Sequence, residues 1–127
     1  MARKDRLNIW MNGVLVGQWI IRQGQSILQY DPQWMKADVG RPLSLSLPFT
    51  QRGEHRGMVV GRYFDNLLPD SVQIRQRIAT HYGLNDLSAF DLLAEIGRDC
   101  AGAIQLLAED VHPQDVKTIA GKPPWVG

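Results

Sequence analysis

The sequence predicts an α+β domain in which a small antiparallel sheet packs with about three helices. Three observations support this fold class. The first third of the chain contains short apolar runs joined by turn residues, which is typical of strands. After residue 58 the apolar residues recur at helical spacing, and a last apolar run near residue 105 would close the sheet.

The sheet is expected to begin with an N-terminal hairpin. Leu7–Met11 is an apolar run, and Asn12 and Gly13 follow it directly. Asn-Gly favours a tight hairpin turn because both residues tolerate a positive φ. Val14–Ile21 then reads as the returning strand, in which Gly17 indicates a bulge or a close approach of backbones.

The segment after the hairpin is expected to add two strands. Ser26–Tyr30 reads as a third strand, and Pro32–Met35 could form one helical turn. Leu43–Leu47 alternates leucine and serine between two prolines, which predicts a short, half-buried strand. Residues Thr50–Gly57 are polar and contain glycine, so we expect an exposed loop there.

The first helix is expected to follow Met58 and to end at a proline. Its expected apolar face is Val59, Tyr63, Phe64, Leu67 and Leu68.

Two further helices carry capping signals. Asp70 or Ser71 would cap a helix whose apolar residues are Ile74, Ile78 and Tyr82, with Gly83 as its C-terminal stop. Ser88 would cap another, with Asp91 three residues later and an apolar stripe of Phe90, Leu93 and Ile96. Ala103–Leu107 reads as the closing strand.

Composition places the chain among small single-domain proteins. It has 127 residues and a net charge of +1, so phosphate neutralisation gives no reason to expect nucleic-acid binding. Residues 1–108 are expected to form the domain, and residues 109–127 a flexible, proline-containing tail. A single cysteine, a charged N-terminus without an apolar stretch after it, and the absence of a membrane-length apolar run predict a cytoplasmic protein.

No arrangement of residue types predicts catalysis. The three histidines lack ligand spacing, the glycines at 53, 57 and 61 do not form a phosphate-binding loop, and no serine lies in a nucleophile elbow. We therefore expect no catalytic residues, no metal site and no cofactor.

The most distinctive segment is a candidate partner-binding site. Its structural interpretation is a helix end, in which the leucines are core and Pro69 stops the helix. The alternative is an interface anchor, because Tyr63 and Phe64 are adjacent and cannot both be buried by one helix face, and polar residues follow them. The candidate contact residues are Tyr63, Phe64, Asp65, Asn66, Leu67, Leu68, Pro69 and Asp70.

Three blocks in order carry a family resemblance. They are Arg41–Pro48 (RPLSLSLP), Phe64–Ser71 (FDNLLPDS) and Phe90–Ala103 (FDLLAEIGRDCAGA). Together they resemble the N-terminal subdomain of the HipA family of bacterial toxin kinases, over roughly Leu7–Leu107. In that family the ATP site and the catalytic aspartate lie C-terminal to this subdomain.

The resemblance implies two readings of function. In split HipBST systems a free-standing protein similar to this subdomain, HipS, acts as the antitoxin of a shortened kinase, so this chain would bind and inhibit a HipA-like serine/threonine kinase. Alternatively, the chain is an excised N-terminal subdomain of a full-length HipA-like kinase and is inactive without the core. A HipB-like helix-turn-helix protein could complete a larger complex, and DNA binding would belong to that partner.

Overall fold

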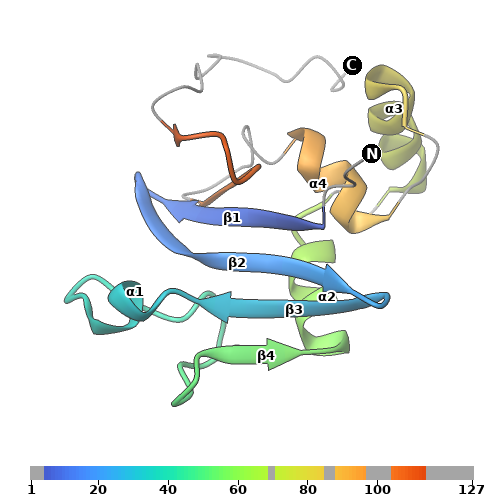
Figure 1. The fold of residues 1–127 in the computed structure, drawn as a ribbon. Coiled ribbons are helices and arrows are strands. Elements are labelled where there is room, and N and C mark those ends of the chain that lie inside the picture. The colour runs from blue at the N-terminus through green and yellow to red at the C-terminus, as the bar shows by residue number, and fades with distance from the viewer. Residues whose placement is uncertain (1–4, 69–70, 85–87, 97–103, 114–127) are drawn as a thin grey trace.

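The computed structural model describes residues 5–68, 71–84, 88–96 and 104–113, and it shows one five-stranded antiparallel sheet with helices on one side (Figure 1). The strand order across the sheet is β4-β3-β2-β1-β5. The strands are β1 (Arg6–Met11), β2 (Val14–Arg22), β3 (Gln25–Tyr30), β4 (Glu54–Arg56) and β5 (Ile104–Leu107). The predicted α+β class is confirmed.

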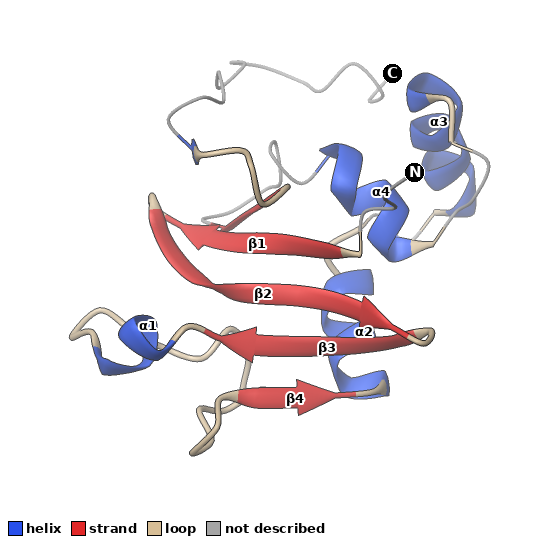
Figure 2. Ribbon diagram, viewed as in Figure 1, coloured by secondary structure: helices blue, strands red, loops and turns tan. Residues whose placement is uncertain are grey.

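Four helices lie in the described part of the chain. They are α1 (Pro32–Lys36), α2 (Met58–Asp65), α3 (Val72–Tyr82) and α4 (Ala89–Ile96). In Figure 2, α2 crosses behind the sheet and α4 lies beside it near β1, whereas α1 extends from the end of β3. Behind the sheet, α2 packs against β3 and α4 packs against α2 and β5.

The predicted N-terminal hairpin is confirmed. Asn12 and Gly13 both have positive φ values, 51° and 81°, as the tight turn requires. The register of β1 and β2 shifts between Ile9 and Trp10, opposite the stretch from Leu15 to Gly17, so a bulge lies there. Gly17 is also a close-approach site, because a Cβ atom on it would lie 2.2 Å from the backbone oxygen of Gln29.

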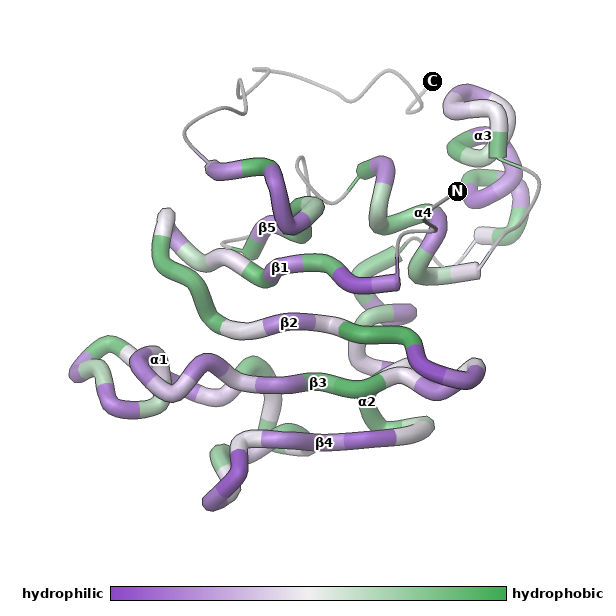
Figure 3. Tube along the Cα trace, viewed as in Figure 1, coloured by the Kyte–Doolittle hydropathy of each residue, from purple (hydrophilic) through white to green (hydrophobic). Residues whose placement is uncertain are grey.

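One face of the sheet forms the core. Figure 3 shows hydrophilic and hydrophobic residues interspersed along β1, β2 and β3, as strands with one buried face require. Trp19 on β2 is the centre of the packing, since it stacks on Phe64 of α2 with a centroid distance of 4.0 Å and meets Phe90 of α4 edge-on at 4.9 Å. Leu7, Ile9, Val16, Leu28, Leu92 and Leu106 are fully buried around these rings.

The prediction of a strand at Leu43–Leu47 is wrong. This segment forms a turn in which the amide of Leu47 donates to the backbone oxygen of Ser44 at 3.0 Å. The alternating leucines do not share a face, because Leu47 is fully buried while Leu45 is fully exposed. The alternating leucines and serines therefore belong to a turn, in which one leucine faces the core and the next faces solvent.

The prediction of a loop over the whole of Thr50–Gly57 is also wrong. Glu54–Arg56 forms β4, which pairs with β3 through His55 opposite Leu28. Polar side chains are compatible with a strand at a sheet edge, where the outer side contacts water. Arg56 Nε donates to Glu54 Oε2 at 2.6 Å, and this bond lowers the pKa of the Glu54 carboxyl.

The helix signals were mostly correct. Ser71 caps α3 by accepting from the amide of Ile74, and Gly83 ends it with a φ of 69°. Ser88 Oγ accepts from the amide of Asp91 at 3.3 Å at the start of α4. The expected helix after Met58 is wrong in two respects: Val60 rather than Val59 is buried, and α2 ends at Asp65, before Leu67 and Leu68.

The residues that follow β5 run back along β1. Glu109 lies 3.5 Å from the Arg6 guanidinium, and the ring of His112 lies 5.0 Å from that of Trp10. The closing strand itself is confirmed from Ile104 onward. Most of the predicted tail, including Trp125, lies outside the described residues, as do Cys100 and the glycines at 97 and 102.

Candidate functional site

The two aromatic residues of the candidate segment lie on different sides of α2. Phe64 is fully buried and Tyr63 is partly exposed, with their rings edge-on at a centroid distance of 5.1 Å. Because Phe64 stacks on Trp19 inside the core, it has no surface to offer a partner in this conformation, and Leu68 is buried in the same core. Phe64 and Leu68 therefore pack as the helix-end interpretation of this segment expects, and their part in partner binding stays a prediction.

The polar residues of the segment also have different surroundings. Asp65 accepts a hydrogen bond of 2.8 Å from Arg75 Nη1, which ties the end of α2 to α3. Asn66 is the C-cap residue of α2, and its side chain is exposed. Leu67 packs partly against the core. Pro69 and Asp70 lie outside the described residues. Of the described members of the candidate set, Asn66 is exposed, Tyr63 and Asp65 are partly exposed, and Tyr63 and Asn66 share a face of α2.

These two residues belong to an outward stripe on α2. Val59, Arg62, Tyr63 and Asn66 are spaced three or four residues apart, so they lie above one another on the face opposite Phe64. Together with Ser44 and Ser46 they line a hollow of about 330 Å³, which we call the α2 hollow. Sequence reasoning missed Arg62 and both serines as site residues, because the serines were assigned to the polar face of a strand.

The loop that forms the other wall of the hollow is held from the sheet. The Tyr30 hydroxyl accepts from the amide of Leu43 at 2.9 Å and donates to the backbone oxygen of Leu47 at 2.5 Å. Trp34 Nε1 donates to the backbone oxygen of Arg41 at 2.9 Å. His55 Nε2 lies 2.6 Å from the backbone oxygen of Pro48. Side chains from three separate elements therefore fix the positions of Ser44 and Ser46.

Burial affects the titration of the residue at the centre of this arrangement. It raises the pKa of Tyr30 above the usual tyrosine range, while the hydrogen bond from the Leu43 amide acts in the opposite direction. The neutral hydroxyl is the form that can donate to Leu47 and accept from Leu43 at the same time. Tyr30 is therefore a structural clamp for the loop.

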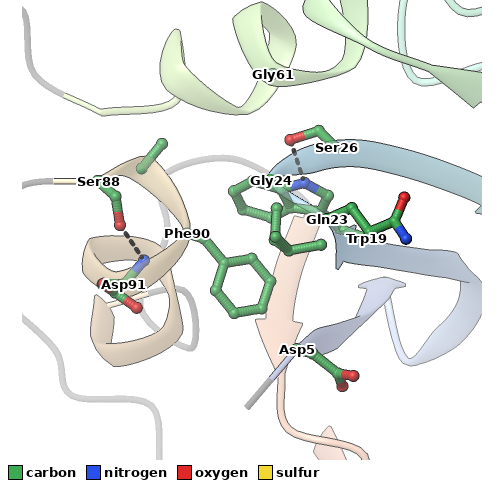
Figure 4. Close-up of a pocket in the computed structure, with 11 residues that line it drawn as sticks. Asp5, Trp19, Gln23, Gly24, Ser26, Gly61, Ser88, Phe90 and Asp91 are labelled. Atoms are coloured by element: carbon green, nitrogen blue, oxygen red, sulfur yellow. Dashed lines mark hydrogen bonds between the residues drawn. The ribbon is translucent and has the colours of Figure 1, made fainter. Parts of the chain in front are cut away.

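A second hollow, of about 540 Å³, lies between the β2–β3 turn and the start of α4 (Figure 4). Trp19 and Phe90 form part of its wall, and Trp19 Nε1 donates to Ser26 Oγ at 3.2 Å. Asp5 and Asp91 lie at its edge. The hydrogen bonds drawn in Figure 4 join residues of the wall to one another, so they stabilise the fold.

The described ranges contain no group of three or more His, Cys, Asp or Glu residues that could hold a metal ion. Within those ranges there is likewise no helix of sufficient length and hydropathy to cross a membrane. Of the two hollows described above, the α2 hollow is the one lined by residues of the candidate segment, Tyr63 and Asn66.

A longer protein aligns with most of this sequence. The chain is 36% identical over 120 residues to the protein named "Putative kinase Y4mE" of Sinorhizobium fredii (strain NBRC 101917 / NGR234). The alignment covers 93% of this chain and 28% of that protein, so the chain spans little more than a quarter of the relative's length.

The fold and the family are found in known proteins as well. A structure of the Shewanella oneidensis MR-1 toxin–antitoxin system, with HipA, HipB and operator DNA, contains a chain that matches with a TM-score of 0.66 at 22% identity. The match covers 83% of this chain and 24% of the other, and it shows a shared fold. The family model of the HipA N-terminal domain matches residues 7–107. This span holds almost the entire sheet and all four described helices, and the chain belongs to the HipA N-terminal domain family.

Proposed function

We propose that this chain is an antitoxin that binds a HipA-like serine/threonine kinase and inhibits it. The observation that supports this most is the match of the HipA N-terminal domain to residues 7–107. In the Sinorhizobium relative, the matching region is joined to a much longer chain that carries a kinase name. A domain joined to a longer chain packs against it through a surface, and the same surface can bind a separate kinase that lacks its own copy.

The outward stripe of α2 is the proposed contact surface. It presents Tyr63 and Asn66, and exposed apolar residues lie beside it at Leu45 and Met58. Aromatic and apolar side chains with polar groups around them are typical of protein interfaces. Asp65 and Leu67 border the surface, and Pro69 and Asp70 stay candidate contact residues on the sequence alone. Phe64 and Leu68 would support it from beneath through the core.

The chain itself carries out no phosphoryl transfer in this proposal. That reaction needs a positioned base, metal-binding carboxylates and a phosphate clamp, which the family resemblance assigns to a core C-terminal to this domain. The role of the chain is therefore to bind, and a HipB-like helix-turn-helix protein would carry the DNA contacts of a larger complex.

A second function is supported by the relative's length. Because the chain covers 28% of the Sinorhizobium protein, it fits equally well as the N-terminal subdomain of a full-length HipA-like kinase. In that case the outward stripe of α2 would pack against the kinase core within one molecule, and the isolated chain would be inactive.

Co-purification and a kinase assay separate the two functions. The chain is expressed with a HipA-like kinase core that lacks its own copy of this domain, and autophosphorylation is measured with and without the chain. A stable complex with suppressed phosphorylation supports the antitoxin. A complex with unchanged or restored phosphorylation supports the subdomain function, and the lack of any complex contradicts the docking surface.

A matched pair of variants links that result to the proposed surface. Tyr63→Ala removes an aromatic from the outward stripe of α2, and we expect weaker binding of the kinase. Val72→Ala removes an exposed apolar side chain, 60% accessible, from α3, and we expect unchanged binding. Equal losses for both variants would contradict the assignment to α2.

A further inference from the structure

The α2 hollow has an uncompensated positive charge. Among the described residues that line it, Arg62 alone is charged. The acidic residue of α2, Asp65, is turned towards Arg75, at 2.8 Å, and does not line the hollow. The guanidinium of Arg62 is exposed at the surface of the helix, so it is available to an anionic group.

The wall opposite Arg62 supplies uncharged hydrogen-bond donors. Ser44 Oγ accepts from the amide of Ser46 at 3.2 Å, which leaves its own proton to donate. Ser46 presents a second hydroxyl, and Asn66 contributes an amide with two donor hydrogens. A charged guanidinium with hydroxyl and amide donors around it is suited to the oxygens of an anion.

A helix end alone would explain only part of this arrangement. Arg62 lies in the last turn of α2, where a cation interacts favourably with the helix dipole and needs no ligand. That role does not involve the serines, which come from a loop that Tyr30 holds against the helix. The interaction of Arg62 with the helix dipole therefore does not explain why the loop places two serine hydroxyls in the same hollow.

The rim of the hollow is apolar, which indicates a protein ligand. Val59 lines the hollow and is 38% accessible. Leu45 lies between the two lining serines in the sequence and is fully exposed, and Met58, which precedes Val59, is 71% accessible. Three of the six large apolar side chains that are exposed in the described ranges therefore line the hollow or directly neighbour a lining residue in the sequence. A volume of about 330 Å³ is at the small end of the ~300–1,000 Å³ typical of ligand pockets, so it fits one side chain.

We propose that the α2 hollow receives the carboxylate of an aspartate or glutamate side chain of the partner protein. Arg62 pairs with the carboxylate, the Ser44 and Ser46 hydroxyls and the Asn66 amide donate to its oxygens, and an apolar neighbour in the partner covers Leu45. This inference rests on the proposed function in one respect, since it takes the partner to be the HipA-like kinase.

The first test uses the free chain and blocked amino acids. N-acetyl-glutamate N-methylamide and N-acetyl-glutamine N-methylamide are titrated separately while amide and arginine Nε signals are followed by NMR. We expect the glutamate compound to shift the signals of Ser44, Ser46, Arg62 and Asn66, and the glutamine compound to leave them in place. Arg62→Ala should abolish the shifts, whereas Arg77→Ala, which removes an exposed arginine from α3, should retain them.

Other outcomes of this titration overturn the proposal. Equal shifts with both compounds, or shifts that survive Arg62→Ala, would mean that the hollow does not select a carboxylate. Shifts with inorganic phosphate and none with the glutamate compound would assign the hollow to a phosphorylated group instead. No shifts with any probe would show that the hollow is not an anion site.

The second test uses the kinase and keeps the two proposals distinguishable. Isothermal titration calorimetry should show about tenfold weaker binding for Arg62→Ala and little change for Arg77→Ala, because only Arg62 pairs with a partner charge. Arg62→Lys should recover part of the loss, since it keeps the charge without the fork of donors. If the wild-type chain does not bind the kinase, the proposed function fails, and the titration with blocked amino acids still decides the chemistry of the hollow.

Discussion

The two faces of α2 have different surroundings, although their residues are neighbours in the sequence. The inward face carries Val60 and Phe64, which are fully buried against the sheet. The outward face carries Arg62 and Asn66, which are exposed and line the α2 hollow. Substitutions on the inward face should therefore change the stability of the domain, and those on the outward face should change what the domain binds. Substitutions on α2 and on the loop that forms the other wall of the hollow test this difference, from the largest expected effect to the smallest.

Phe64→Ala should have the largest effect on folding. The change removes a fully buried ring that stacks on Trp19, and it leaves a cavity between α2 and β2. Loss of a buried phenylalanine costs about 3–5 kcal/mol of the free energy of unfolding. Urea denaturation followed by circular dichroism measures it, with Tyr63→Ala as the neighbouring control. Equal losses for the two variants would contradict the division of α2 into two faces.

Tyr30→Phe should have a smaller effect than Phe64→Ala, and it acts on the other wall of the hollow. The change leaves the Leu43 amide and the Leu47 carbonyl without their hydroxyl partner. Unsatisfied buried groups of this kind cost about 1–3 kcal/mol. Hydrogen exchange should show faster exchange for the amide of Leu43 than in the wild type. Unchanged exchange there would show that Trp34 and His55 hold the loop without help.

The raised pKa of Tyr30 predicts that the stability of the domain depends on pH. Burial raises the pKa of folded Tyr30, so the folded protein keeps its hydroxyl neutral at a pH where the unfolded chain ionises. This contribution to stability is complete below the unfolded pKa of about 10, and it is lost as the pH rises from there towards the folded pKa. Thermal unfolding between pH 8 and 11 should show less alkaline loss for Tyr30→Phe than for the wild type. Tyr82→Phe, as a control, should leave the alkaline loss in place.

Asp65→Asn should have a smaller effect. Asp65 joins α2 to α3 through Arg75, and its side chain is 49% exposed. A partly exposed ion pair contributes about 0.2–1 kcal/mol, and salt screens it. Urea denaturation should therefore show a loss at low salt that shrinks in 1 M NaCl. A loss that did not depend on salt would mean that the hydrogen-bond geometry, rather than the charge, holds the two helices together.

Local signals in the sequence predicted the elements whose partners are close by in the chain. Asn12-Gly13 predicted the hairpin, and Ser71 and Gly83 predicted both ends of α3. Each depends on backbone conformations that its own residues favour. The family resemblance added the relation to a family of kinases, which composition and periodicity did not provide.

The errors at Leu43–Leu47 and Glu54–Arg56 have one physical cause, which is contact between residues far apart in the sequence. Leu43–Leu47 alternates like a strand, but the Tyr30 hydroxyl fastens it as a turn. The polar sequence of Glu54–Arg56 does not predict a strand, but the segment forms one because it pairs with the edge of β3. The α2 hollow went unrecognised for the same reason, since its serines and Arg62 come together only when the turn lies over α2.

Leu45→Ala should have the smallest effect on folding, and it tests the comparison within one loop. Leu45 is fully exposed and Leu47 is fully buried, although they are two residues apart. Leu47→Ala should cost about 2–5 kcal/mol, whereas Leu45→Ala should change the free energy of unfolding by less than about 0.5 kcal/mol. Because an exposed leucine adds nothing to the core, a drop in kinase affinity for Leu45→Ala in calorimetry would reflect binding alone. Unchanged stability with unchanged affinity would instead remove this loop from the docking surface and leave α2 to bind without it.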